Sequence, residues 1–274
     1  MSAAPAPAPS SSVPDLGSRA ALVRDLAVAS GAVIRRWFRQ GATVMDKSDD
    51  SPVTRADQDS EAIIRHLITR RFPEDGIIGE EHGVEGREAE FVWVIDPIDG
   101  TGAFIAGLPV FTTLIGLAWR GRLVLGAVHQ PVTGEFWIGG VGVPATLNDQ
   151  LVLARLCPRL SDAVLFSTDP ALLSAADSPG FEALCAAIRR RRLGTDGYGG
   201  AMVASGHADL WCEAGMKVYD YAALVPLIEA AGGRISDWQG KPLGLDGDGT
   251  VLASGDPALH GAALALLRPE ASPE

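Results

Sequence analysis

A chain of 274 residues with 47% hydrophobic residues is long enough for one large domain or two packed halves around a substantial core. Its formal net charge of −11 argues against nonspecific binding to nucleic acid and to anionic membranes, because both are polyanions. The three cysteines, Cys157, Cys185 and Cys212, lack a CxxC spacing and indicate neither a disulfide framework nor a zinc site, so a reducing, cytoplasmic compartment fits best.

Residues 1–16 are rich in Ala, Pro and Ser and are predicted to form a disordered tail. They contain neither the basic nor the apolar segment of a secretory signal peptide, and no run reaches the roughly 20 apolar residues that a membrane-spanning helix needs. After this tail we expect an N-terminal α+β half, residues 17–150, and a C-terminal α/β half, residues 151–268. The composition breaks between them, at the glycine-rich residues 139–144.

In the N-terminal half, apolar residues recur at helical spacing over 18–40, and Gly41 supplies a stop signal. A second amphipathic helix should begin near Asp57 and end before Pro73. Residues 76–79 are predicted as a short strand that ends in two acids, Glu80 and Glu81. Further along, three strands joined by short turns indicate an antiparallel meander, over residues 110–120, 123–130 and 135–139.

The most informative stretch is residues 91–107, FVWVIDPIDGTGAFIAG. Its first residues are typical of a strand, which we expect to stop at Asp96 because Pro97 fixes φ and cannot continue the hydrogen-bonded ladder. If the chain turns there, Asp99 can face the same point as Asp96, with the carbonyl of Ile98 exposed between them.

A helix is predicted to open directly after these acids, at Gly100 and Thr101, and its first N–H groups would be free to receive an anion. Hard oxygen ligands beside an anion site suit Mg²⁺ that carries a phosphate. Taken alone, the hexapeptide is also compatible with an ordinary Asx-turn and helix cap, which Asp-Pro and Asp-Gly often signal.

The C-terminal half alternates strands and helices, which predicts a largely parallel or mixed sheet with helices on its faces. Strands are expected over residues 164–167, near 193, and over 210–213, 234–236 and 251–254. Helices are expected over residues 181–190, 198–205 and 220–231 and from Pro257 onward. The basic run Arg189 to Arg192 is interpreted as a solvated helix end, with phosphate binding as a minor alternative.

Several acids end apolar segments or begin helices, namely Glu80, Asp96, Asp99 and Asp220. Bringing such acids together is costly unless cations neutralise them. Two or three Mg²⁺ ions would do so, and could also activate a water and stabilise a leaving alkoxide. The simpler alternatives are that Asp57 stabilises a helix dipole and that Asp220 caps a helix.

Four motifs stand in the order found in the inositol monophosphatase superfamily: Pro52-Val-Thr-Arg-Ala-Asp57, Gly79-Glu-Glu81, Asp96-Pro-Ile-Asp-Gly-Thr101 and Tyr219-Asp-Tyr-Ala-Ala223. The chain therefore resembles these Mg²⁺-dependent, lithium-sensitive phosphomonoesterases. The resemblance implies a mixed α/β (α+β) fold, built as a five-layer αβαβα sandwich. It also implies a homodimer as the candidate assembly, because family members are commonly dimers.

Carried over to this chain, the resemblance implies that the metal ligands are Glu80, Asp96, the Ile98 carbonyl, Asp99 and Asp220. Asp57 and Thr101 would orient and deprotonate the attacking water, with Glu81 assisting. Lys47 matches a lysine of the family's flexible loop near the catalytic metals. The substrate is expected to contact Asp99, Gly100, Thr101, Asp196, Glu213 and Asp220.

Two places depart from the family pattern. Gly102 and Ala103 stand where many relatives carry polar residues, and Tyr219 replaces a common tryptophan. Neither departure removes an expected ligand.

Within the superfamily the chain is most similar to the histidinol-phosphate phosphatase branch. The similarity rests on residues 109–115, 129–135, 194–198 and 219–226. Asp196 and Glu213 match positions where the family contacts the organic part of the substrate, and two carboxylates would complement the ammonium and imidazole groups of histidinol. Asp196 is equally compatible with a simple turn in Thr-Asp-Gly.

The expected function is therefore that of a Mg²⁺-dependent phosphoric monoester hydrolase, which converts L-histidinol phosphate to L-histidinol and phosphate in histidine biosynthesis. One alternative is another ester: an inositol 1-phosphate, a sugar bisphosphate or 3′-phosphoadenosine 5′-phosphate. A second alternative is a non-catalytic protein that binds Mg²⁺ or a phosphate ligand. A third is a structural α/β protein whose acidic motifs are unrelated turns. The expected partner is a small phosphate ester, with no nucleic acid and no membrane.

Overall fold

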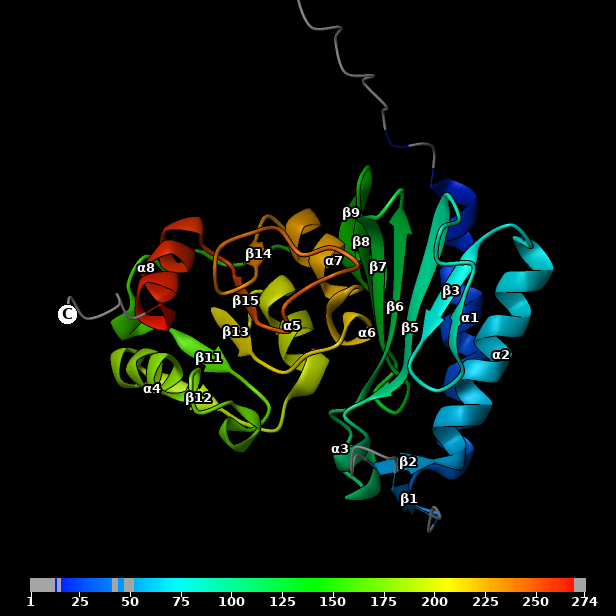
Figure 1. The fold of residues 1–274 in the computed structure, drawn as a ribbon, viewed down its shortest axis with the longest axis horizontal. Coiled ribbons are helices and arrows are strands. Elements are labelled where there is room, and N and C mark those ends of the chain that lie inside the picture. Colours follow the sequence, from blue (N-terminus) through cyan, green and yellow to red (C-terminus); the bar gives the residue numbers. More distant parts are fainter. Residues whose placement is uncertain (1–12, 14–15, 41–43, 47–51, 269–274) are drawn as a thin grey trace, which may run out of the picture.

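The computed structural model describes residues 13, 16–40, 44–46 and 52–268. Five layers follow one another across the molecule (Figure 1): helices α1 and α2, an eight-stranded sheet, helices α5 to α7, a five-stranded sheet, and helices α4 and α8. The expected mixed α/β fold and its five-layer αβαβα arrangement are confirmed. Most of the predicted tail, residues 1–12, 14 and 15, lies outside the described residues, whereas Leu16 is buried.

The first layer consists of α1 (Gly17–Trp37) and α2 (Arg55–Arg71). Their buried apolar side chains, such as Leu26 and Ile64, share a core with Trp93 of the eight-stranded sheet. Between these helices the chain forms a small antiparallel ladder of β1 (Val44–Asp46) and β2 (Pro52–Thr54), which the sequence did not predict.

The eight-stranded sheet has the order β10-β9-β8-β7-β6-β5-β3-β4. Within it β3 and β5 are parallel, and the predicted meander is confirmed as antiparallel pairs of β6 with β7 and of β7 with β8. The strands are β3 (Gly76–Gly79), β4 (Gly83–Glu85), β5 (Phe91–Asp99), β6 (Thr112–Trp119), β7 (Arg122–Gln130), β8 (Glu135–Gly140), β9 (Val143–Leu147) and β10 (Gln150–Leu151).

The central strand β5 was predicted to stop at Asp96, but it continues to Asp99. Its pairing with β6 shifts register between Asp96 and Asp99, because Pro97 has no N–H to donate to the ladder. The strand therefore bends at this point and stays in the sheet. Every residue of β5 is buried, as expected for a strand covered on both faces.

The five-stranded sheet is mixed, as predicted, with the order β12-β11-β13-β15-β14. Its strands are β11 (Val164–Phe166), β12 (Arg190–Arg192), β13 (Leu210–Glu213), β14 (Arg234–Ser236) and β15 (Val251–Ser254). Helices α4 (Ser178–Ala187) and α8 (Pro257–Leu267) cover its outer face (Figure 1). Two short 3₁₀ turns, η1 (Leu160–Asp162) and η2 (Pro170–Leu172), flank β11.

The middle layer contains α5 (Asp196–Ala204), α6 (Val218–Tyr221) and α7 (Leu224–Ala230). The single helix predicted over residues 220–231 is therefore split. Pro226 lacks an N–H and its ring clashes with the carbonyl four residues earlier, that of Ala222, which is where the helix breaks. The broken backbone lies directly on the sheet, since a Cβ at Gly126 would come within 1.8 Å of the Ala223 oxygen.

The basic run Arg190–Arg192 also differs from its prediction. The residues form β12, an exposed edge strand of the second sheet, and α4 already ends at Ala187. Long charged side chains suit such a position, because they oppose pairing of the free strand edge with other chains.

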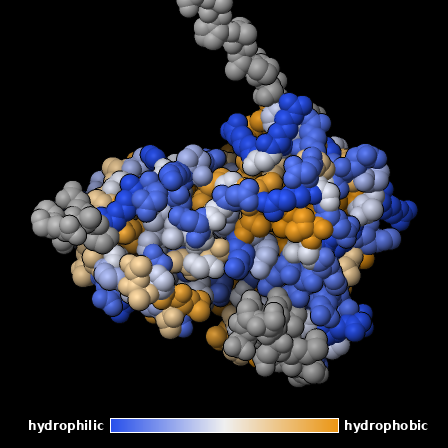
Figure 2. Space-filling view, in the orientation of Figure 1, coloured by the Kyte–Doolittle hydropathy of each residue, from blue (hydrophilic) through white to orange (hydrophobic). Residues whose placement is uncertain are grey.

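Apolar side chains are concentrated between the layers, in three cores that together cover both faces of both sheets. The face shown in Figure 2 is mostly hydrophilic, and its hydrophobic areas are separated from one another. Among the described residues, no helix is both long and apolar enough to cross a membrane.

Candidate active site

Strand alternation directs three acids toward the middle layer. Along β5, Trp93 and Ile95 enter the core on the α1–α2 side, whereas Val92 and Val94 enter the core on the α5–α7 side. Because successive side chains point to opposite faces, Asp96 continues the second series. The same alternation along β3 and β13 directs Glu80 and Glu213 into the middle layer.

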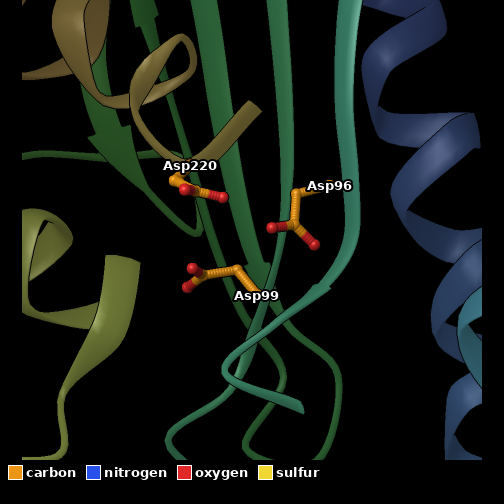
Figure 3. A group of neighbouring side chains, drawn as sticks. All are labelled: Asp96, Asp99 and Asp220. Atoms are coloured by element: carbon orange, nitrogen blue, oxygen red, sulfur yellow. The ribbon is translucent and has the colours of Figure 1, made fainter. Parts of the chain in front are cut away.

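Three carboxylates surround a common space at the junction of β5 and α6 (Figure 3). Asp96 and Asp99 come from β5 and Asp220 comes from α6, and one carboxylate oxygen from each lies within 4.8 Å of the others. Asp220 is also a helix cap, since its Oδ2 accepts a hydrogen bond from the Lys217 N–H at 2.7 Å. Asp220 therefore caps α6 and also belongs to the carboxylate cluster.

A cavity of about 310 Å³ opens over these carboxylates. All the residues predicted to bind metal or substrate line it: Glu80, Asp96, Ile98, Asp99, Gly100, Thr101, Asp196, Glu213 and Asp220. The structure thus brings together side chains that are far apart in the sequence. Lys47 lies outside the described residues, and Glu81 does not line the cavity.

The electrostatics of the cluster favour bound protons or a bound cation. Burial raises the pKa of Asp96 well above its usual range, and the charges of Glu80, Asp99 and Asp220 raise it further. Burial likewise raises the pKa of Asp220 to about 7. Among the described residues, Oδ1 of Asp96 is buried and has no hydrogen-bond partner. A buried, unpartnered carboxylate oxygen among like charges fits a divalent cation with oxygen ligands.

Asp57 reaches the site from the first turn of α2. Its Oδ2 accepts hydrogen bonds from the N–H (2.8 Å) and hydroxyl of Thr54, and the Thr54 side chain in turn accepts from the Ala56 N–H, which completes a capping box. The Thr101 hydroxyl lies 3.3 Å from Oδ1 of Asp57 and 3.0 Å from the Ile98 carbonyl, and it can donate to either. Burial raises the pKa of Asp57, although the Thr54 hydrogen bonds lower it in part. The predicted pair of Asp57 and Thr101 is therefore in contact.

Helix α3 (Thr101–Ile105) opens at the cavity behind Gly100. Gly100 has φ +84°, and a Cβ there would lie 2.8 Å from Oδ2 of Asp196. Phe104 anchors the helix by packing edge-to-face on Phe111, with ring centroids 5.1 Å apart. The turn predicted to receive an anion is thus held rigidly between the carboxylates and an aromatic cluster.

Two further acids, Asp196 and Glu213, line the cavity. Asp196 lies beside the cluster, since the N–H of the following residue, Gly197, donates to Oδ2 of Asp99 at 2.7 Å, and burial together with the Asp196 charge raises the pKa of Asp99. Thr168 donates a hydrogen bond to Glu213 at 3.0 Å. Burial raises the pKa of Glu213 to about 8. Asp196 begins α5 with φ +43°, a strained value for a residue other than glycine. Apolar Leu172 and Met216 complete this part of the wall.

Three supporting residues escaped the sequence analysis. Thr112 donates a hydrogen bond to Oδ2 of Asp99 at 3.1 Å, Thr168 donates one to Glu213, and the buried Glu61 binds the turn that follows β3. For Glu61 a signal existed, since it lies four residues after Asp57 on the same face of a helix. The threonines act on partners distant in sequence, and no local pattern marks them.

The sequence is similar to a family model and to several known phosphatases. The model of the inositol monophosphatase family matches residues 16–271. The chain is 42% identical over 262 residues to the chloroplastic bifunctional phosphatase IMPL2 of Arabidopsis thaliana, covering 92% of this chain and 76% of that protein. It is 34% identical over 235 residues to the histidinol-phosphatase of Chlorobaculum parvum, covering 85% of this chain and 91% of that protein.

Among solved structures, an inositol monophosphatase from Zymomonas mobilis is 40% identical and superimposes with a TM-score of 0.86, covering 93% of this chain and 99% of the other. Family model, relatives and structure all extend over nearly the whole length of the described residues. The chain belongs to the inositol monophosphatase family, a family of phosphatases.

Proposed function

We propose that the protein is a Mg²⁺-dependent phosphomonoesterase that hydrolyses L-histidinol phosphate to L-histidinol and phosphate, a step of histidine biosynthesis. The observation that carries the proposal is one cavity lined by two sets of acids, a cluster of Asp96, Asp99 and Asp220 and, next to it, Asp196 and Glu213. The first set suits metals and phosphate, and the second suits an organic group that carries an ammonium and hydrogen-bonding nitrogens.

Two or three Mg²⁺ ions would be held by Glu80, Asp96, the Ile98 carbonyl, Asp99 and Asp220. When bound there, Mg²⁺ would lower the pKa of a coordinated water and neutralise charge on the phosphate. The residues fit such ions, because they are buried or half-buried oxygen donors, four of them carboxylates, and include the unpartnered Oδ1 of Asp96.

Thr101 and Asp57 would prepare the attacking water. With its hydroxyl donated to Asp57, Thr101 Oγ1 can accept a hydrogen bond from the water and so orient it. The water proton would pass through Thr101 to Asp57 as the water oxygen bonds to phosphorus. The phosphorus–oxygen bond to the alcohol then breaks, and the alcohol oxygen leaves as an alkoxide that takes up a proton from solvent. The N–H groups of Gly100 and Thr101 would hold the phosphate oxygens, and Glu81 would assist Asp57.

The position of Asp196 favours an amine close to the phosphate. Its carboxylate lies beside Gly100, where the phosphate is proposed to bind. In histidinol phosphate the ammonium-bearing carbon is next to the ester CH₂ group, so the ammonium would meet Asp196. Glu213, which accepts a hydrogen bond from Thr168, would then hydrogen-bond the imidazole ring beside Leu172 and Met216.

The relatives support both this substrate and an alternative. One is named a histidinol-phosphatase, and the Arabidopsis protein is named a bifunctional phosphatase. The Zymomonas structure is named an inositol monophosphatase, which keeps inositol 1-phosphate as the second candidate. Asp196 and Glu213 favour histidinol phosphate, because inositol offers hydroxyl groups and no cation.

The decisive experiment measures phosphate release with Mg²⁺ from histidinol phosphate, inositol 1-phosphate, fructose 1,6-bisphosphate and 3′-phosphoadenosine 5′-phosphate, with Asp99→Asn as an inactive control. We expect histidinol phosphate to lead in kcat/KM. Asp196→Asn should lower its kcat/KM by about 10- to 100-fold, the value of one charged hydrogen bond, and affect inositol 1-phosphate less.

Other outcomes are equally informative. If another ester leads, the metal chemistry stands and the assignment of Asp196 and Glu213 is wrong. If no ester is cleaved while the protein still binds Mg²⁺, a non-catalytic binding protein becomes the better description.

We further propose a homodimer. Three leucines of one short segment, Leu151, Leu153 and Leu156, are each at least 73% exposed, and a second copy of the chain would cover them. Sedimentation equilibrium should give twice the monomer mass, and Leu153→Asp should shift the protein toward the monomer. A wild-type monomer at all concentrations would refute this assembly.

A further inference from the structure

A buried ion pair connects α2 with the turn that follows β3. Glu61 is completely buried, and Arg65, one helical turn later, donates from Nε to its Oε1 at 2.6 Å. Arg65 also donates to the Gly83 carbonyl and, at 3.2 Å, to Glu85. Neither Glu61 nor Arg65 lines the cavity, so both act on it only through the turn.

The Glu61 carboxylate binds the backbone of this turn directly. Its Oε2 accepts from the Glu81 N–H at 2.7 Å, and its Oε1 accepts from the His82 N–H at 3.1 Å. On the preceding side, a Cβ at Gly79 would lie 2.0 Å from Oε1, so glycine alone leaves room for the carboxylate. The chain therefore wraps around Glu61 on both sides of Glu80.

We propose that Glu61 is a positioning residue for the metal centre. It would hold the turn that carries Glu80 and Glu81 in place beside the carboxylates of β5. The inference rests on the proposed Mg²⁺-dependent function. On the same helix Asp57, one turn earlier, contacts Thr101. A single rigid helix thus aligns two segments that supply different parts of the site, the turn after β3 and the start of α3.

The physical reason is repulsion within the cluster. Glu80 and Asp96 are like-charged neighbours, and the turn carrying Glu80 would move outward if nothing held its backbone. Hydrogen bonds from backbone N–H groups to a carboxylate are charge-assisted and roughly twice as strong as neutral ones. A buried ion pair is itself weak evidence for stability, since apolar replacements are often neutral or stabilising. The backbone contacts give this pair a more specific role.

The test measures metal binding without substrate. Mn²⁺ is titrated into the full chain and followed by electron paramagnetic resonance. In Glu61→Gln the amide NH₂ cannot accept from one of the two N–H groups, so we expect Kd for Mn²⁺ to rise by about 10- to 100-fold, as is typical for residues that support metal ligands. The Mg²⁺ concentration for half-maximal activity should rise similarly, while kcat at saturating Mg²⁺ approaches that of the wild type.

Glu85→Gln is the matched control. It removes the same charge from another partner of Arg65, one whose side chain is 72% exposed, and leaves the Glu61 contacts in place. Its Kd for Mn²⁺ should stay within about twofold of the wild type, the usual range of a surface substitution.

The outcomes separate the two proposals. If the wild type shows no saturable Mn²⁺ binding, the proposed metal-dependent function fails. If the wild type binds Mn²⁺ and folded Glu61→Gln binds it equally well, the positioning role is overturned. Should near-UV circular dichroism show that Glu61→Gln is unfolded, Arg65→Lys decides, because it retains the charge but lacks the separate N–H groups that bind Glu61, Gly83 and Glu85. Weaker Mn²⁺ binding by Arg65→Lys would support the proposal, and unchanged binding would overturn it.

Discussion

Glu213 combines deep burial with hydrogen bonds from two hydroxyl groups, those of Thr168 at 3.0 Å and Ser167 at 3.4 Å. Burial outweighs these hydrogen bonds and raises the pKa of Glu213 to about 8. At neutral pH the carboxyl group is therefore mainly protonated before substrate binds, and it can donate as well as accept a hydrogen bond. An imidazole ring, which carries both a donor and an acceptor nitrogen when neutral, suits such a group.

The raised pKa of Glu213 predicts a pH dependence of stability. The native protein holds this proton more tightly than the unfolded chain, where the pKa is near 4.5. The stabilisation is fully present below about pH 4.5 and is lost as pH rises toward 8. In metal-free protein, Glu213→Gln should flatten this loss, which amounts to at most about 5 kcal/mol. Urea unfolding in EDTA between about pH 5 and pH 8 measures it, and an unchanged slope would contradict the assignment.

Two features of position 100 require glycine: its backbone conformation and the close approach of Asp196. Its φ of +84° disfavours any side chain, and a Cβ would lie 2.8 Å from Oδ2 of Asp196. Gly100→Ala should cost about 1–2 kcal/mol of backbone strain and displace Asp196, and so lower kcat/KM by at least about tenfold. Gly102→Ala is the control, since a Cβ there meets nothing within 4 Å. Equal activity of the two variants would show that the close approach is unimportant.

At the scale of elements, strands with strong local patterns were predicted well. The structure confirms the expected bounds of β3, β13, β14 and β15. Each is short, mostly apolar and bounded by polar or glycine-rich residues, so its limits are encoded locally. The strands β1, β2, β4, β9 and β10 were missed because their pairing depends on partners that only the fold brings near.

The candidate site was predictable for a related reason. Acids at or near the ends of apolar strands, such as Asp96 and Glu213, are marked in the sequence by the strand itself, and alternation then directs them to one layer. Thr112 and Thr168 sit beside their acids only after the sheets pack, so their contribution could not be read locally. Pro226 did carry a readable signal, a helix break at Ala222, which the single predicted helix over residues 220–231 ignored.

The packing of α6 and α7 against the sheet offers a test at this scale. A Cβ at Gly126 of β7 would lie 1.8 Å from the Ala223 oxygen, and backbone atoms cannot give way as a flexible side chain can. Gly126→Ala should therefore destabilise the fold by about 1–3 kcal/mol or more and displace the helix that carries Asp220. Gly261→Ala in α8 is the control, because it meets nothing within 4 Å and should be neutral or slightly stabilising. Urea unfolding of both variants distinguishes them.

In the whole molecule, the two sheets send their terminal acids into the same middle layer from opposite sides. Glu80 and Asp96 come from the eight-stranded sheet, Glu213 comes from the five-stranded sheet, and Asp220 comes from a helix between them. The cavity therefore exists only when the two sheets and the layer between them are assembled. Folding must bring these like charges together, so the active site opposes the stability of the metal-free protein.

The stability that the clustered acids cost the metal-free protein can be measured with Asp96→Asn. In EDTA the variant should be more stable than the wild type, because the buried Asp96 carboxyl group must either carry a charge that Glu80, Asp99 and Asp220 repel or take up a proton, and the asparagine amide does neither. With Mg²⁺ at about 100 times its Kd, the wild type should gain about 2.7 kcal/mol of unfolding free energy, and the variant should gain far less. The difference in unfolding free energy between Asp96→Asn and the wild type should therefore be smaller in Mg²⁺ than in EDTA, or reverse its sign.

The control is Glu74→Gln, which removes the same charge from an exposed residue and should change the unfolding free energy by no more than about 0.5 kcal/mol in either condition. If Asp96→Asn instead destabilises the metal-free protein and keeps the full gain from Mg²⁺, Asp96 holds the fold together and does not bind the metal. Because the fold brings together the cluster from two elements distant in the sequence, β5 and α6, this single substitution tests whether the protein gives up stability in the metal-free state to form a cation site.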